Sequence, residues 1–399
     1  MKLKEICTVF SDGDWIESKS QSDKGIRLIQ TGNIGEGKYL EKTERAKYIS
    51  EDTFKELKCT EIFSGDILVS RLPEPIGRAC IIPDKSERMI TAVDCTICRV
   101  NENIANREYI CYFMQSQLYY NRLLGNVTGT TRKRISRKNL GNIELVIPTL
   151  NEQKAIVKKL NYLTKGINLR RKELEYLDTL IKARFVEMFG DIKVNPNGYQ
   201  LIKMRNLIAS CEAGWSGNGI QRPKKENEIA VLKVSSVTKG YFIPEECKVL
   251  DNQDNIKKYI SPKKGDLIFS RANTREMVGA TAITLEDYPK LILPDKLWRV
   301  RFGDKVNVFY MKYMLSSKSI REQFSAVSTG TSGSMFNVSM EKFKSIEIPV
   351  APINLQNQFA DFVKQVNKSK VVYQIIINKL TFLQKICYNN YKEQYHIPG

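Results

Sequence analysis

The sequence predicts an α+β fold that is built twice, because a unit of about 200 residues is repeated in tandem. The heptapeptide GDILVSR at residues 65–71 returns as GDLIFSR at residues 265–271. Other matching segments follow in the same order, at offsets of 200 to 203 residues. Each copy then ends in a long stretch with the apolar spacing of a coiled-coil helix. We therefore expect two similar α+β domains, each followed by a long helix.

The order of the matching segments is the strongest sign of duplication, since chance similarity does not preserve order. The pairs are VTGT (127–130) with STGT (328–331), VDCTICRV (93–100) with PDKLWRV (294–300), IRLIQTGNI (26–34) with IAVLKVSSV (229–237), and IELVIP (143–148) with IEIPV from Ile346, where Pro148 is matched to Pro349. A repeat of this length corresponds to one domain with an appendage.

Within each copy, short β-type segments surround one helical segment. DILVS, ACIIP, CTICRV and IELVIP in the first copy are rich in Val and Ile and are bounded by Gly, Pro or charged residues, which predicts strands. Residues 108–124 have apolar side chains at three- and four-residue spacing, which predicts a helix. Residues 309–324 predict the equivalent helix in the second copy.

After Pro148 the pattern changes to one long helix per copy. Thr149 or Asn151 can cap the first helix, and Gly190 can end it. Its 4,3-spaced seam is Ile156, Leu160, Leu163, Ile167, Arg170, Leu174, Leu177, Ile181, Arg184 and Met188. The second seam is Phe359, Val363, Val366, Lys370, Tyr373, Ile377, Leu380, Gln384, Cys387 and Tyr391. The alternative is a pair of surface helices, each packed on its own domain.

The predicted boundaries are 1–148 for the first domain, 149–190 for the first helix, 195–350 for the second domain and 352–393 for the second helix. The linker after the first helix is short, so the second domain should sit at the far end of that helix. The second helix can bury its seam by returning antiparallel along the first. We therefore expect two domains separated by a two-helix coiled coil, with approximate twofold symmetry.

Composition indicates a polyanionic partner. The chain has 63 Lys and Arg against 44 Asp and Glu, a net charge of +19 that is spread through both halves. Such an excess favours nucleic acid. No apolar run is long enough to span a membrane, and we expect neither a signal peptide nor membrane binding. The nine scattered cysteines are expected to be free thiols in a reducing cytoplasm.

No catalytic motif is recognised in the sequence. A phosphate-binding loop of the GxxxxGK[ST] type, a base-flipping Asn-Pro-Pro-aromatic motif and a PD…ExK nuclease motif are all missing. The one histidine, His396, lies three residues from the C-terminus. Cys95 and Cys98 form a single CxxC, for which a strand is favoured over a zinc site. We expect no catalytic site, no metal and no cofactor in this chain.

DNA contacts are expected from Lys and Arg on phosphates and from polar side chains on base edges. The candidates in the first copy are Arg71, Arg78, Thr128, Thr130, Thr131, Arg132, Lys133, Arg134 and Arg137. Those in the second copy are Arg271, Asn273, Arg275, Thr329, Thr331 and Ser332. Two alternatives stay open: a solvated basic loop at 128–138, and a structural ion pair for Arg71 and Arg271.

The order of domain, helix, domain and helix resembles the specificity (S) subunit of type I restriction-modification systems. The features that carry the resemblance are the duplicated heptapeptide, the TGT turns, and IPTLNEQKAIV at the start of the first helix. In that last motif Pro148, Glu152, Gln153 and Ile156 fit the family pattern. The second copy departs from it, because Leu355 stands where the acidic residue is expected, before Gln356.

The resemblance implies that each domain is a target recognition domain that reads one half of a bipartite double-stranded DNA site. The helices would set the unread spacer and would dock two modification (methyltransferase) subunits. The interface residues expected on the helices are Ile156, Leu160, Leu163, Ile167, Leu174, Leu177, Ile181, Phe359, Val363, Val366, Tyr373, Ile377 and Leu380. S-adenosylmethionine, ATP and magnesium would be used by the modification and restriction subunits.

Two other classes remain open at this stage. One is a DNA-modifying enzyme with an unrecognised catalytic site, which the purified chain would reveal by turnover. The other is a scaffold that binds nucleic acid without sequence preference.

Overall fold

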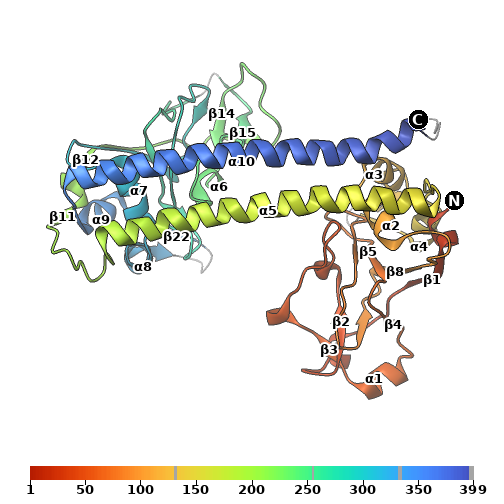
Figure 1. Cartoon of the computed structure of the whole chain (residues 1–399). Coiled ribbons are helices and arrows are strands. Elements are labelled where there is room, and N and C mark those ends of the chain that lie inside the picture. The colour runs from red at the N-terminus through yellow and green to blue at the C-terminus, as the bar shows by residue number, and fades with distance from the viewer. Residues whose placement is uncertain (130–132, 254–255, 331–334, 395–399) are drawn as a thin grey trace. The chain divides into compact units, whose positions relative to one another are not determined.

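The computed structural model describes residues 1–129, 133–253, 256–330 and 335–394, with residues 388–394 as backbone only. The chain divides into two compact units. Unit 1 comprises Met1–Arg171 and Gln374–Gly399, and unit 2 comprises Lys172–Tyr373. Two long helices, α5 (Leu150–Phe189) and α10 (Ile353–Gln394), each contribute one part to each unit (Figure 1).

Unit 1 is a mixed α+β structure. Besides its parts of α5 and α10 it contains β1 (Cys7–Asp12), β2 (Ile26–Ile29), β3 (Tyr48–Ile49), α1 (Glu51–Glu56), β4 (Glu61–Ile62), β5 (Ile67–Ser70), β6 (Ala79–Ile81), β7 (Met89–Thr91), β8 (Cys95–Val100), α2 (Arg107–Phe113), α3 (Gln117–Leu124), β9 (Val127–Thr128), β10 (Arg134–Ile135) and α4 (Arg137–Gly141).

Unit 2 repeats this plan. It contains β11 (Leu201–Lys203), β12 (Ile208–Ala213), β13 (Gly219–Ile220), β14 (Ala230–Leu232), α6 (Ser235–Thr238), β15 (Cys247–Leu250), β16 (Leu267–Ser270), β17 (Ala272–Asn273), β18 (Thr281–Ile283), β19 (Leu291–Ile292), β20 (Leu297–Phe302), α7 (Val308–Ser316), α8 (Lys318–Val327), β21 (Thr329–Gly330), β22 (Phe336–Asn337), α9 (Met340–Ser345) and β23 (Glu347–Pro349).

The sheet topology confirms the duplication. An antiparallel sheet has the strand order β1-β8-β5-β6 in unit 1 and β12-β20-β16-β18 in unit 2. A second sheet in each unit contains one parallel pair, β2 with β7 and β14 with β19. Strand β2 lies in the segment IRLIQTGNI and strand β14 in the segment IAVLKVSSV. The sequence match between these two segments is therefore also confirmed.

Each helix predicted within a domain is broken in two. Ser116 separates α2 from α3, because its hydroxyl accepts the Tyr119 N–H at 3.2 Å and so begins a new helix. Ser317 also stands between α7 and α8 and has an extended backbone there, but its side chain makes no capping hydrogen bond. The single helices expected at 108–124 and 309–324 are therefore wrong, since apolar spacing alone does not register a break in the helical backbone.

Two other sequence expectations are corrected by hydrogen bonds. The segment 143–148 is no strand and makes a single bridge, Lys2 with Glu144. The match of Pro148 to Pro349 is also wrong, because Pro349 O accepts the Tyr310 hydroxyl whereas the equivalent Tyr109 hydroxyl donates to Val146 O.

The start and end of α5 are explained by local sequence. Thr149 and Glu152 form a reciprocal cap, with the Thr149 N–H donating to Glu152 Oε2 at 2.9 Å. Gly190 ends the helix with a φ of 76°, a left-handed conformation that favours glycine. In the second copy Pro352 has no side-chain acceptor for such a cap, which accounts for Leu355 at the position equivalent to Glu152.

The two long helices pair antiparallel within each unit. In unit 1, Gln384 Nε2 donates to Thr164 Oγ1 at 2.9 Å, and Leu380 lies beside Gly166. In unit 2, Lys370 Nζ donates to Asp178 Oδ1 at 2.7 Å, and the rings of Phe359 and Phe185 are 5.3 Å apart. Within each unit the residue numbers rise along α5 as they fall along α10. The antiparallel coiled-coil pairing expected from the seams is therefore confirmed within each unit.

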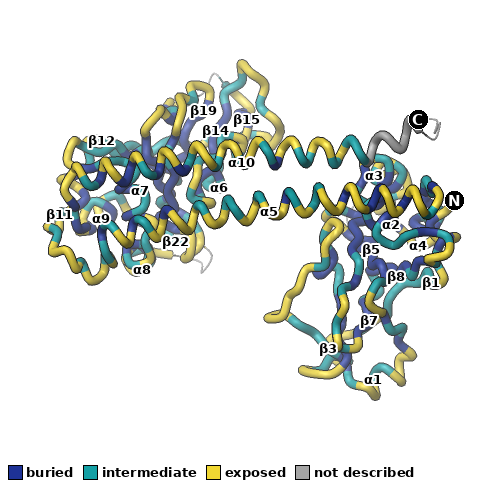
Figure 2. Tube along the Cα trace, viewed as in Figure 1, coloured by how far each residue is buried: buried dark blue, intermediate teal, exposed yellow. Residues whose placement is uncertain are grey.

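The core of unit 2 includes the helices as well as the sheet. Phe189 of α5 packs against Tyr310 of α7, with ring centroids 4.8 Å apart, and against Phe359 of α10, with ring centroids 5.6 Å apart. Figure 2 shows buried positions on α5 and α10 as well as in the domains. In unit 1, Ile156 and its neighbours on α5 join the domain core in the same way. The helix ends are thus part of each domain's hydrophobic core, as the alternative of helices packed on their own domain also anticipates.

Among the described residues, no helix combines the length and the apolar character that crossing a membrane would need.

Lys312 on α7 is half-buried, and its ammonium lies 4.0 Å from the centroid of the Tyr313 ring. Burial lowers its pKa to about 8, opposed by Asp178, which is already paired with Lys370; Lys182 lowers the pKa further. A folded pKa below the unfolded value means that the charged form costs stability; this cost is full below pH 8 and falls as the pH rises from about 8 to the unfolded pKa of 10.5.

Replacing Lys312 with methionine is therefore expected to raise the free energy of unfolding of unit 2 at pH 7 by about 2 kcal/mol. The gain should shrink between pH 8 and pH 10. Denaturant unfolding of the full chain, followed by fluorescence of the buried Trp298, measures this effect. Lys318→Met, at a side chain that is 91% exposed, is the matched control and should change stability by less than about 0.5 kcal/mol. A Lys312→Met protein no more stable than the control would contradict the prediction.

Candidate nucleic-acid interface

The repeated heptapeptide forms a buried turn and strand in both units. Gly65 and Gly265 have φ values of 90° and 86°, which only glycine adopts without strain. The next residues, Asp66 and Asp266, are buried and accept the backbone N–H three residues upstream at 2.9 and 2.8 Å. The motif is therefore repeated because it builds the antiparallel sheet of each domain.

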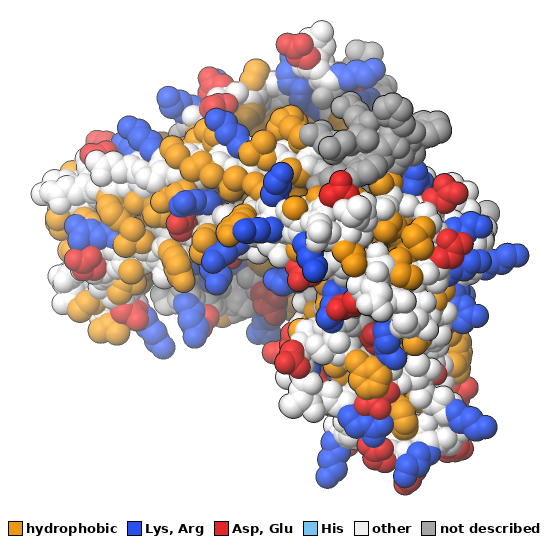
Figure 3. Space-filling view, turned by 45° about the vertical axis from the view of Figure 1, so that its right-hand side comes forward, with side chains coloured by type: hydrophobic (Ala, Val, Ile, Leu, Met, Phe, Trp, Pro, Cys, Tyr) orange, Lys and Arg blue, Asp and Glu red, His pale blue; other side chains and the backbone are white. Residues whose placement is uncertain are grey.

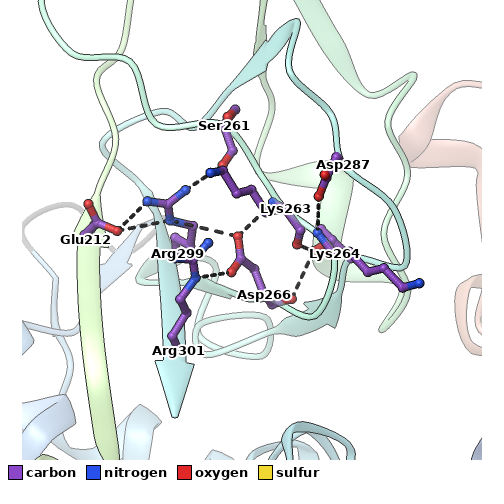
Figure 4. Close-up of polar contacts among 9 residues, drawn as sticks. Glu212, Ser261, Lys263, Lys264, Asp266, Asp287, Arg299 and Arg301 are labelled. Carbon is purple, nitrogen blue, oxygen red and sulfur yellow. Dashed lines mark hydrogen bonds and ion pairs between the residues drawn. The ribbon is translucent and has the colours of Figure 1, made fainter. Parts of the chain in front are cut away.

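Asp266 also neutralises arginine side chains of the neighbouring strand β20 (Figure 4). Arg301 Nε donates to Asp266 Oδ1 at 2.6 Å, and Arg299 Nε lies 3.9 Å from Asp266 Oδ2. Arg299 further donates to Glu212 Oε2 at 2.6 Å and to Ser261 O at 2.8 Å. In unit 1, Asp66 binds Arg99 through both carboxylate oxygens. These charges are engaged inside the domains.

Arg71 and Arg271, at the end of the heptapeptides, are held by internal contacts. Arg71 is 4% exposed, donates to Val93 O at 2.6 Å, and forms an ion pair with Asp12 at 3.3 Å that lacks hydrogen-bond geometry. Burial lowers its pKa. Arg271 donates to Asp295 O at 2.9 Å. Both residues therefore form the structural ion pair that the sequence left open, and their contact with DNA stays a prediction.

Arg78 is likewise buried, and each of its three guanidinium nitrogens donates to a backbone carbonyl. The acceptors are Ile34 at 2.7 Å, Thr31 at 2.8 Å, Leu72 at 2.9 Å and Pro75 at 3.0 Å. Arg78 therefore ties the loop after β5 to the loop after β2, and its guanidinium is not presented to solvent.

In unit 1 the β9–β10 hairpin and the adjoining start of α4 carry exposed cations. Lys133, Arg134 and Arg137 are exposed, as is Thr128, and Arg134 forms an ion pair with Asp94 at 3.1 Å. The hairpin is joined to the end of the heptapeptide, since the Ile135 N–H donates to Arg71 O at 3.2 Å. The candidates Thr130, Thr131 and Arg132 lie outside the described residues.

In unit 2 the structure brings the two candidate segments together in one small sheet of order β17-β22-β21. Asn337 pairs with Ala272 on one side and with Thr329 on the other, so the strands of Asn273 and Thr329 flank the same central strand β22. Arg275 is exposed, lies over the Phe336 ring at 5.7 Å and donates to Ser325 at 3.3 Å. The candidates Thr331 and Ser332 lie outside the described residues.

Sequence reasoning missed the acidic partners of these arginines. Asp94 binds Arg134 and Asp295 binds Arg271, at the start of β8 and β20 respectively. The signal was present, because the two aspartates match within the repeated segments 93–100 and 294–300.

The predicted seam of the helices faces inward. Its buried members are Ile156, Leu160, Ile167, Ile181, Phe359, Val363, Val366 and Ile377, and its half-buried members are Leu163, Leu174, Leu177, Tyr373 and Leu380. Other apolar residues of the two helices are exposed: Tyr162, Leu169, Tyr176, Leu180 and Val186 on α5, and Val371, Val372, Ile375, Phe382 and Leu383 on α10. The sequence did not single these out.

Two further motifs were weighed as sites in the sequence, the CxxC pair and the histidine. Cys95 and Cys98 lie in strand β8 and are buried, which confirms the strand. Their thiol pKa values are raised by burial. His396 lies outside the described residues. On the face shown in Figure 3, Lys and Arg side chains are interspersed with acidic and apolar ones, without one continuous basic patch.

Known proteins share the duplicated pattern of this chain. A family model described as the type I restriction modification DNA specificity domain matches residues 1–178 and 219–381. The specificity subunit of the type I restriction enzyme EcoKI from Escherichia coli (strain K12) is 23% identical over 366 residues, which cover 86% of this chain and 75% of that protein.

Two solved structures share the fold. One, from work on complex assembly and conformational transition of the type I R-M system, has a TM-score of 0.54 at 16% identity and covers 98% of this chain and 96% of that chain. The other, the type I restriction-modification S subunit from M. genitalium, has a TM-score of 0.50 at 12% identity, with coverage of 98% and 95%. Since the family model matches both repeats, the chain belongs to the type I restriction-modification DNA specificity family, whose members are the non-catalytic subunits that determine DNA sequence specificity.

Proposed function

We propose that this chain reads a bipartite double-stranded DNA site for a type I restriction-modification complex, with one half-site for each α+β domain. The domains are residues 1–148 and 195–350, and the helices 149–190 and 352–393 set the spacer between the half-sites. The observation that carries this proposal is a repeated scaffold with different exposed hairpins.

The hairpins differ in their chemistry although the scaffold beneath them is the same. The first presents Lys133, and Arg137 follows at the start of α4; both can bind phosphates. The second copy has no Lys or Arg from Ser328 to Val338, and Arg275 is supplied from the neighbouring strand segment instead. An arginine fork suits guanine, and the Asn273 amide suits adenine. Two such surfaces would read two different half-sites.

The exposed apolar residues of the helices are the proposed docking faces for two modification subunits. Two of them recur at the spacing of the duplication, since Leu169 corresponds to Val372 and Leu180 to Leu383. Equivalent faces on the two helices suit two copies of one partner. S-adenosylmethionine, ATP and magnesium would belong to the modification and restriction subunits, and the complex would act on DNA in the cytoplasm.

Sequencing DNA methylation in cells with and without this chain tests the function. We expect one bipartite adenine-methylation motif to disappear when the chain is removed. The purified chain should by itself neither methylate nor cleave DNA. Turnover by a preparation free of partner subunits would favour an enzyme, and binding that is equal on all DNA sequences would favour a scaffold.

Lys133→Ala and Arg137→Ala are expected to weaken DNA binding of the complex about equally for all sequences. Each should reduce the slope of the logarithm of affinity against the logarithm of salt concentration by about one, because each removes one phosphate contact. Affinity measured at several salt concentrations checks this, with Lys55→Ala as the control, at an exposed lysine on α1. A sequence-dependent loss would instead indicate a base contact.

A further inference from the structure

Each long helix has a fully buried glutamine in its first turn, Gln153 in α5 and Gln356 in α10, both 0% exposed. Glutamine is usually found on the surface, and a buried amide is costly unless both of its ends are hydrogen-bonded. The two residues are 203 positions apart, so the duplication has preserved them in the same place.

In unit 1, Gln153 joins three parts of the structure. Its Oε1 accepts the Asn106 N–H at 2.7 Å, and its Nε2 donates to Pro148 O at 2.8 Å. Asn106 is the residue that caps α2, since its side chain accepts the Tyr109 N–H at 3.0 Å. One side chain of α5 therefore holds both the segment that enters α5 and the first residue of a domain helix.

Unit 2 repeats this arrangement contact by contact. Gln356 Oε1 accepts the Asn307 N–H at 2.8 Å, and its Nε2 donates to Ala351 O at 2.7 Å and to Lys305 O at 3.3 Å. Asn307 caps α7, accepting the Phe309 N–H at 2.9 Å. Both ends of this amide are engaged, which leaves the side chain a single orientation.

A second bond from the same domain helix restricts rotation about the glutamine. The Tyr109 hydroxyl donates to Val146 O at 2.9 Å, and the Tyr310 hydroxyl donates to Pro349 O at 2.8 Å. Apolar packing around Ile156 or Phe359 is non-directional and tolerates small rotations. Directional bonds at two points, by contrast, define an angle between the domain helix and the long helix.

We propose that Gln153 and Gln356 are positioning residues that fix the angle between each DNA-reading domain and its long helix, and thereby the strictness with which spacer length is selected. This inference rests on the proposed function, in which the two domains read two half-sites. A rotation of the domain at the start of its long helix displaces the loops that contact DNA. One base pair adds only about 3.4 Å to the spacer. A small variation in the angle between domain and helix would therefore let the complex bind sites whose spacer is one base pair shorter or longer.

The test uses the assembled modification complex on plasmids that carry the two half-sites at the natural spacer and at spacers one base pair shorter and longer. Gln356→Met keeps the length of the side chain and removes its donor and acceptors. We expect the preference for the natural spacer to fall about fivefold, since a misplacement of about 1 Å at a positioned site already changes rates by up to about 100-fold. Methylation at the wrong spacers should rise relative to the natural one.

Gln358→Met is the matched control, because Gln358 is exposed and lies two residues further along the same helix. It should leave the spacer profile unchanged. Gln356→Glu retains an acceptor for the Asn307 N–H and should restore part of the selectivity. Gln153→Met should also reduce the preference for the natural spacer, in this case through the first domain. Hydrogen exchange of the full chain should show faster exchange at the Asn307 amide in Gln356→Met, with the β16 amides still protected.

The possible failures are distinguishable. A wild-type complex that methylates no bipartite sequence overturns the proposed function, and this inference with it. A strict wild-type profile that Gln356→Met leaves strict, or reduces by the same factor at all three spacers, overturns this inference alone, because the glutamine then serves folding only. Loss of hydrogen-exchange protection at the β16 amides in Gln356→Met would also overturn this inference alone, because the substitution would then have unfolded the domain sheet.

Discussion

Asp266→Ala is expected to lower the free energy of unfolding of unit 2 by about 3 kcal/mol, because it removes the buried acceptor of the Lys263 N–H and the counter-charge of Arg301. The carboxylate is 1% exposed, accepts the Lys263 N–H and neutralises Arg301 and Arg299. This loss of about 3 kcal/mol is at the lower end of the range for breaking a buried ion pair, because the Arg301 side chain is 41% exposed and water can solvate it after the substitution. Denaturant unfolding monitored by Trp298 fluorescence measures this loss.

Asp361→Ala is the matched control for this substitution. Asp361 forms an ion pair with Lys364 one turn along α10 at 2.9 Å, with side chains 70% and 54% exposed. Such surface pairs contribute less than about 1 kcal/mol, so the control should unfold almost like the wild type. If Asp266→Ala and Asp361→Ala proved equally stable, the repeated aspartate would not be a stabilising element of the sheet, and its recurrence would need another explanation.

Adding four residues to each long helix is expected to lengthen the spacer of the methylated DNA motif by one or two base pairs while both half-sites stay the same. The insertions belong at facing positions, after Arg171 in α5 and after Ile376 in α10. This placement keeps the Thr164–Gln384 contact in unit 1 and the Asp178–Lys370 contact in unit 2. Four residues lengthen a helix by about 6 Å, compared with about 3.4 Å per base pair.

Four residues also preserve the apolar seam, because a step of four is one of the two steps of the heptad. Two residues at the same places turn the remainder of each helix by about 200°, so Ile181 and Ile377 would face away from their partners. We expect the two-residue variants to lose complex assembly and methylation. Methylome sequencing of cells that carry each variant gives both answers. Persistent methylation with an unchanged spacer in the four-residue variant would show that the helices do not measure the spacer.

Several features of the protein were determined by the sequence alone, because their signals are local or periodic. The duplication was visible from the order of matching segments, and the long helices from the 4,3 apolar spacing that ends at Gly190. The start of the first helix was predicted at Thr149 or Asn151, and the hydrogen bonds between Thr149 and Glu152 identify Thr149 as the cap. Each depends on residues within a few turns of one another, so chain order already contains the geometry.

Other features were decided only by tertiary structure. The internal partners of Arg71 and Arg271 are Asp12, Val93 and Asp295, which lie tens of residues away along the chain. The register of the repeats near the long helices was set by the hydroxyl of Tyr310 and the amide of Gln356, whose bonds span 39 and 49 residues. A burial pattern or a motif in the sequence gives residue type and spacing. The hydrogen-bond partners of a long polar side chain are fixed only when folding brings distant backbone carbonyls within hydrogen-bonding distance of it.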